Sequence, residues 1–166
     1  LELTALLARS FGADEPSTVE EFRSGGGLPN ASPRVGPVVI HEIQYHPSPL
    51  EDEFVELHNL SAESVSLAGW RLGGVRNLEG TDDYELPSGA QVAAGGYLLL
   101  VPVDPATFRG RYSVPAAVPI VGPYTGALDN AGERLELLEP AAEVGGFIVV
   151  DSIRYNDREP WPPLTQ

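Results

Sequence analysis

Residues 38–49 read VVIHEIQYHPSP, and this stretch decides between a helical zinc site and a β-strand. In the zinc-protease pattern HExxH, two histidines four residues apart lie on one face of a helix, where both ligate the metal. Here His46 follows His41 by five residues, so a helix would hold the two rings roughly 140° apart. β-Branched residues precede His41 and two prolines follow His46, which is typical of a strand that ends at a turn. The stretch therefore predicts a strand and not a metalloprotease site.

Composition limits the classes of protein that the chain can represent. Its 166 residues are 42% hydrophobic, which suits one domain with a real core plus an extension. No apolar run reaches the roughly 18 residues of a membrane span, so membrane insertion is not expected. The absence of Cys excludes disulfides and thiol catalysis. The formal net charge of −14 disfavours nucleic acid as a partner, because an acidic surface repels phosphate.

The first 36 residues differ from the rest of the chain. Residues 24–33 read SGGGLPNASP, a density of glycine and proline that indicates a linker. We interpret residues 1–36 as the tail of a preceding module plus this linker, and residues 37–166 as a β-sandwich domain. Because the chain begins with Leu1 and contains no Met, we expect it to be cut from a longer protein.

Short apolar segments separated by turn residues continue to the end of the chain. We expect strands over residues 38–44, 53–58, 67–72, 84–87, 91–93, 97–101, 118–121, 133–138 and 147–155. Strands at a spacing of about ten residues, with no convincing long helix, are typical of an all-β sandwich or barrel. Pro119 makes the segment over 118–121 a candidate edge strand.

Six stretches of the chain resemble the lamin tail domain family in order and spacing. They are 38–43 (VVIHEI), 52–59 (DEFVELHN), 67–72 (LAGWRL), 86–98 (LPSGAQVAAGGYL), 126–133 (GALDNAGE) and 150–155 (VDSIRY). The family's corresponding segments read VINEI, EWIELYN, LSGWTL, FPAGTTLAPGGYLV, GSLSNSGE and VDSVTY. His41 stands where Asn is usual. The resemblance covers about residues 36–163 and implies an immunoglobulin-like antiparallel β-sandwich with an irregular N-terminal extension.

The resemblance also implies a setting. Bacterial copies of the family usually lie in large secreted or surface-attached proteins. The resemblance therefore implies that this chain is a family member of the bacterial extracellular type, located outside the cell or on its surface. The expected partners are neighbouring domains of the same chain and an unknown protein or polysaccharide. The family offers no catalytic residues to transfer, so we do not expect an enzyme.

Trp70 is the predicted anchor of the core, where burial of its indole contributes about 2–3 kcal/mol by area. The alternative for this ring is an exposed platform that stacks on sugars. The other residues predicted to form the core are Ile40, Leu57, Leu72, Leu99, Leu135, Leu137 and Ile153.

Two kinds of binding site are candidates. Oxygen ligands for calcium are available in Asp52, Glu53, Asp129 and Asn130, because the loops of a sandwich gather at its ends. The alternative for these residues is an ordinary turn or a solvated loop. Aromatic residues beside prolines and glycines are candidates for stacking on a ligand: Tyr45, Tyr124 and Trp161.

One pair of residues is a candidate for catalysis. Glu42 and Glu56 lie in the first two predicted strands and would be close together if those strands pair, although such glutamates more often face solvent or pair with arginine. We therefore predict a non-catalytic structural or protein-interaction module of a larger secreted or surface protein, with no cofactor. The alternative is a carbohydrate-binding module, stabilised by calcium.

Overall fold

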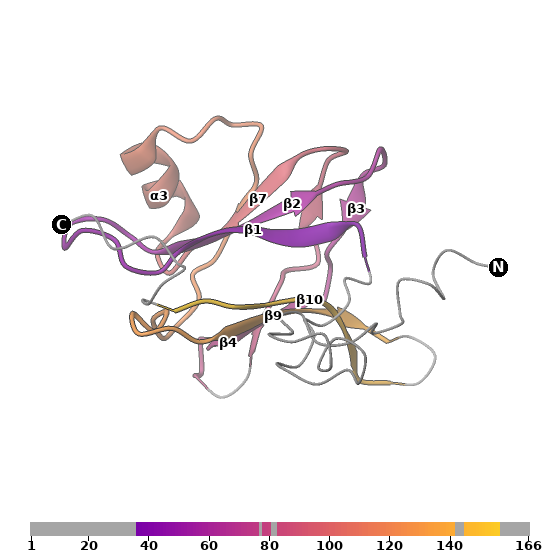
Figure 1. Cartoon of the computed structure of the whole chain (residues 1–166). Coiled ribbons are helices and arrows are strands. Elements are labelled where there is room, and N and C mark those ends of the chain that lie inside the picture. The colour runs from indigo at the N-terminus through magenta and orange to yellow at the C-terminus, as the bar shows by residue number, and fades with distance from the viewer. Residues whose placement is uncertain (1–35, 77, 81–82, 142–144, 157–166) are drawn as a thin grey trace, which may run out of the picture. The chain divides into compact units, whose positions relative to one another are not determined.

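The computed structural model describes residues 36–76, 78–80, 83–141 and 145–156, and these fold into two facing four-stranded sheets (Figure 1). The first sheet has the order β1 (Val38–Gln44), β2 (Phe54–Asn59), β7 (Tyr97–Leu100), β8 (Ile120–Val121). The second has the order β10 (Phe147–Arg154), β9 (Arg134–Pro140), β4 (Arg71–Arg76), β5 (Asp83–Glu85). A short pair joins β3 (Val65–Ser66) to β6 (Gln91–Val92). The expected all-β, immunoglobulin-like sandwich is confirmed.

Nearly all the neighbouring strands pair antiparallel, as expected, but β8 runs parallel to β7. A parallel pair needs a crossover instead of a hairpin. Helix α3 (Pro105–Tyr112) supplies that crossover between the two strands. Among the described residues, no helix has the length and apolarity needed to cross a membrane.

The main core lies between the two sheets and follows the alternation of strand residues. On β2, Val55 and Leu57 are fully buried, whereas the intervening Glu56 is half-buried on the outer face. The predicted core residues Trp70, Ile40, Leu57, Leu72, Leu135 and Leu137 are all buried in this cluster. Ile153 is only partly buried and packs against it. Leu99 is buried elsewhere, on the outer face of the first sheet.

Trp70 is 5% exposed, but of the strand expected over residues 67–72 only the last two residues are in a strand. Residues 67–70 form a turn in which the Trp70 N–H donates to the Leu67 carbonyl at 3.1 Å. Gly69 adopts a φ of 74° in this turn, a conformation that favours glycine. Strand β4 begins only at Arg71. The indole therefore enters the core from the turn before the strand.

The buried Asn59 ends β2 and holds the loop that follows. Its side-chain amide donates to the carbonyls of Glu63 at 2.7 Å and Ala93 at 3.0 Å. The side-chain oxygen Oδ1 of Asn59 accepts from the Ser61 N–H at 3.0 Å. These bonds satisfy a polar group that is 0% exposed, as a buried amide requires.

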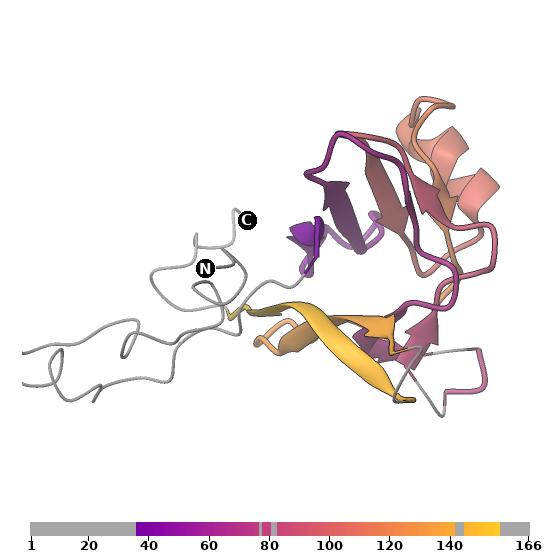
Figure 2. The same ribbon diagram turned by 90° about the vertical axis from the view of Figure 1, so that its right-hand side faces the viewer.

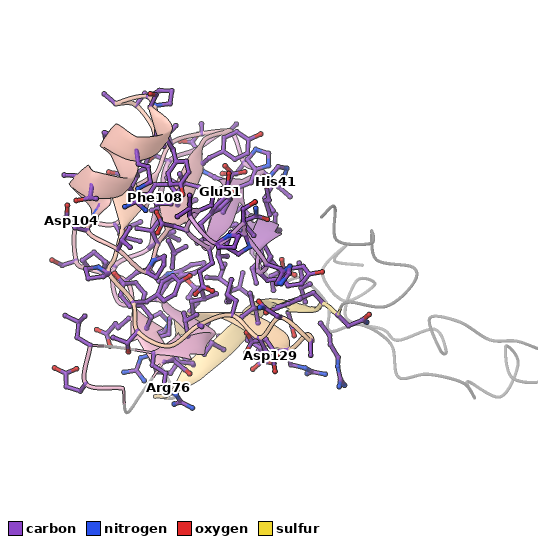
Figure 3. All side chains as sticks on the ribbon, turned by 90° about the vertical axis from the view of Figure 1, so that its left-hand side faces the viewer. His41, Glu51, Arg76, Asp104, Phe108 and Asp129 are labelled. Atoms are coloured by element: carbon purple, nitrogen blue, oxygen red, sulfur yellow. The ribbon has the colours of Figure 1, made fainter. Side chains whose placement is uncertain are left out.

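Helix α3 was not expected from the sequence. The Asp104 side chain caps it by accepting from the Thr107 N–H at 2.9 Å, and Pro105 occupies its first turn. Phe108 is buried against Leu99 on the outer face of the first sheet, and Figure 3 shows it below the helix. The helix thus covers part of that outer face with a second, smaller apolar cluster.

The fully buried Leu57 and the exposed Leu60 give a matched test of the main core. Leu57→Ala should lower the free energy of unfolding by about 2–5 kcal/mol, because it leaves a cavity between the sheets. Leu60→Ala removes the same atoms from a side chain that is 58% exposed and should change stability by less than about 0.5 kcal/mol. Urea unfolding measures both, and equal losses would contradict the placement of Leu57.

Candidate functional site at the β1–β10 edge

Among the described residues, strands β1 and β10 are each the last strand of their sheet, and they adjoin at one edge of the sandwich. Figure 2 shows the two layers, with β1 in indigo in one and β10 in yellow in the other. Both strands carry an irregular register, between Ile40 and Glu42 in β1 and between Val149 and Asp151 in β10. Such bulges redirect side chains and are common at sheet edges.

The bulge in β10 turns a carboxylate into the interior. Asp151 is 2% exposed, and its Oδ2 accepts from the Ile40 N–H of the opposite sheet at 2.9 Å. Its Oδ1 accepts from the Ser152 N–H at 3.0 Å. A buried carboxylate is tolerated when hydrogen bonds replace its hydration. Asp151 therefore joins the two sheets at this point of the edge.

Beyond Asp151, a groove of about 130 Å³ lies between the two strands. Its walls come from both sheets and are mostly apolar: His41, Ile43, Tyr45, Ile153 and Tyr155. The rings of Tyr45 and Tyr155 lie 4.6 Å apart between centroids. An open apolar groove with a few polar groups is the kind of surface that takes up a ligand side chain.

Carboxylates surround the Tyr155 end of the groove. The Tyr155 hydroxyl donates to Glu133 Oε1 at 2.9 Å, and the same oxygen accepts from the Asp129 N–H at 2.9 Å. Burial raises the pKa of Tyr155, and the hydrogen bond to Glu133 and the charges of Glu133, Asp129 and Glu53 raise it further. The Tyr155 hydroxyl therefore stays protonated, and its hydrogen bond to Glu133 fixes the position of the ring.

A second carboxylate, Glu53, connects this end to the loop before β9. Its Oε2 accepts from the Leu128 N–H at 3.0 Å and its Oε1 accepts from the Tyr124 hydroxyl at 3.1 Å. Burial raises the pKa of Glu53, against the effect of these two bonds, and the charge of Glu133 raises it further. Glu53 thus ties the start of β2 to the loop over residues 124–133.

The other end of the groove carries histidine and glutamate. His41 Nδ1 lies 2.7 Å from Glu56 Oε1, on the outer face of the first sheet. His58 and Tyr97 stack beside it with their centroids 4.3 Å apart. Glu42 and Glu56 are register partners, as the predicted pairing of the first two strands requires. The partner of Glu56 is a histidine and not an arginine.

The structure divides the four candidate calcium ligands between different partners. Asp52 forms an ion pair with Arg111 of α3 and accepts from the Tyr112 hydroxyl. Glu53 reaches the loop that holds Asp129 and Asn130, but its oxygens accept from protein donors as described above. Asp129 accepts from the N–H of Ala131, and Asn130 is exposed. In the part of the chain that the structure describes, no three such side chains gather to hold a metal ion.

The aromatic candidates also separate. Tyr45 is half-buried and lines the groove. Tyr124 is 2% exposed, so the prediction that it stacks on a ligand is wrong: its ring is enclosed in the core and its hydroxyl is directed to Glu53. Trp161 lies outside the described residues. The stacked pair of the half-buried His58 and the exposed Tyr97 was missed, although both side chains point outward in strands whose inward residues are strongly apolar.

Comparison with known families agrees with this arrangement of strands. The family model of the Lamin Tail Domain matches residues 31–157, which is most of the chain. The chain belongs to the lamin tail domain family. This membership confirms the resemblance seen in the sequence. Lamin tail domains are immunoglobulin-like modules with structural and protein-interaction roles and are not enzymes. No curated protein matches the chain.

The raised pKa of Glu53 makes a pH-dependent contribution to stability. Because the folded state holds the Glu53 proton more tightly than the unfolded state, this contribution is full below the ordinary pKa of 4.5 and is lost as the pH rises through the folded pKa. The free energy of unfolding relative to Glu53→Gln should therefore decline as the pH rises from 4.5. Urea unfolding across this range measures it, with Glu63→Gln at an exposed position as the control for charge. A difference that grows with pH would contradict the burial of Glu53.

Proposed function

We propose that this lamin tail domain is a non-catalytic module that binds a protein partner through the groove at the β1–β10 edge. The observation that carries the proposal is the groove itself. It is apolar, open to solvent, and built from the last strands of two sheets. Exposed sheet edges beside side-chain pockets are a recurrent way for proteins to bind extended segments.

The surroundings of the groove support a binding role. The bond from Ile40 to Asp151 fixes the distance between the strands at one end, and the bond from Tyr155 to Glu133 fixes a ring at the other. Walls that are already held in place lose little conformational entropy on binding. A partner would therefore meet a largely preformed surface.

The proposal includes a setting in a larger bacterial protein that is secreted or attached to the cell surface. The sequence resemblance favours this setting, and the glycine-rich stretch over residues 24–33 suits a linker to a neighbouring domain. In that setting the module would space neighbouring domains and present its groove to a protein outside the cell. The high net negative charge would keep such a module soluble.

Selection from a random peptide library on the full 166-residue chain tests the proposed function. Selected peptides should lose at least about tenfold in affinity, or 1.4 kcal/mol, on Ile43→Gln and on Ile153→Gln, which alter the groove from opposite sheets. Leu60→Gln likewise replaces an aliphatic side chain with glutamine, but at an exposed position away from the groove, and should leave the affinity unchanged. Thermal unfolding of each variant confirms that it is folded.

A parallel titration tests the alternative of a carbohydrate-binding module. A panel of polysaccharides is titrated against the chain with millimolar calcium and again with EDTA. The proposal expects no sugar affinity in either condition. Peptide binding that is equal on all three variants, or micromolar sugar affinity that EDTA abolishes, would overturn the proposed function.

A further inference from the structure

We infer that the partner is an extended segment that adds to the first sheet beside β1, places one aliphatic side chain in the groove and carries lysine or arginine on either side of it. This inference rests on the proposed function and specifies the chemistry of its ligand. Three observations lead to it: the direction of the β1 backbone, the size of the groove and the charges around it.

The backbone of β1 points away from its sheet at the groove. The Asn59 N–H donates to Gly96 on the β7 side, so alternate residues of β2, including Val55, also direct their backbone groups toward β7. Ile43 is the register partner of Val55. The N–H and C=O of Ile43 therefore face the free edge, as the Ile40 N–H does where it reaches Asp151.

An incoming strand would complete this edge and fill the groove at the same time. Residues directly opposite one another in an antiparallel pair place their side chains on the same face of the sheet. Ile43 packs toward the core, so the residue that pairs with it would point into the groove between Ile43 and Ile153. A helix would not use this edge, because its backbone groups are bonded within the helix.

The volume of the groove fits one aliphatic side chain. An apolar cavity of about 150 Å³ holds one benzene molecule. The groove measures about 130 Å³ and is lined by two isoleucines and two tyrosines besides His41. A leucine or isoleucine at the anchor position of the partner matches both the volume of the groove and its apolar walls. A charged anchor would lose its hydration without gaining a partner there.

The charges around the groove favour basic residues on either side of the anchor. Glu133 and Asp129 lie close enough to Tyr155 for their charges to raise its pKa. Glu56 lies beside His41 at the opposite end. Arg134 on β9 and Arg154 on β10, which adjoin the groove region in sequence, are register partners. Both alternate with the inward Leu135 and Ile153, so their side chains are directed to the outer face. The ends of the groove are thus acidic.

The same charges disfavour a second copy of this chain as the occupant. Each copy has a formal net charge of −14, so two edges brought together would repel one another. A basic segment of another protein meets no such barrier and would be steered toward the groove at low ionic strength.

Synthetic peptides of about eight residues, the usual length of a strand, test the inference on the full chain. The parent peptide has one leucine between alternating threonines and lysines. Its variants replace the leucine with alanine, replace the lysines with glutamates, or methylate the backbone nitrogens that face β1. Each change should lower the affinity at least about tenfold, as measured by fluorescence anisotropy. Raising the salt from about 50 to 300 mM should weaken the parent, because its contacts are partly ionic.

The outcomes distinguish this inference from the proposed function. If library peptides lose affinity on Ile43→Gln and Ile153→Gln but tolerate backbone methylation or the change to glutamate, the inference is overturned and the proposed function stands. If binding ignores both groove variants, both fail. Sedimentation of the free chain supplies a further check, since a dimer that Ile43→Gln dissociates would make a second copy the occupant and overturn the inference.

Discussion

The hydrogen bond between the Ile40 amide and the buried Asp151 carboxylate is the constraint on which this structure depends. A carboxylate removed from water costs several kcal/mol unless donors replace its hydration, so the two strands must approach closely enough for β1 to supply one. The bulges in both strands make that approach possible. The same bond determines where the sandwich is closed at this edge and where the groove begins.

Packing covers both faces of much of the first sheet but leaves its β1 edge open. Its inner face packs in the sandwich core, and α3 covers its outer face over β7 and β8 through Phe108. The ion pair between Asp52 and Arg111 further ties that helix to the segment before β2. The β1 side of the sheet, where Ile43 lines the groove near the end of the strand, keeps both an open backbone edge and an apolar wall. Binding is therefore expected where packing leaves the sheet incomplete.

Much of the fold followed from alternation, whereas most of the site did not. Val55 and Leu57 repeat at the period of a strand, so β2 and its burial could be predicted. Trp70 was expected to be buried, but the turn that carries it depends on a bond to Leu67 that the sequence pattern does not reveal. The Asp104–Pro105 start of α3 was a readable signal of a helix, and it was overlooked because only about two turns follow. The inward position of Asp151 depends on a bulge, and a one-residue insertion reverses the face of every following side chain.

Amide hydrogen exchange on the free 166-residue chain tests the central claim most directly, because it reports on the two critical amides of β1 separately. Both belong to the same strand, three residues apart, so general fraying of the strand would affect them together. The account predicts a strongly protected Ile40 amide, bonded to Asp151, and a rapidly exchanging Ile43 amide at the free edge. Equal protection of the two amides would contradict it.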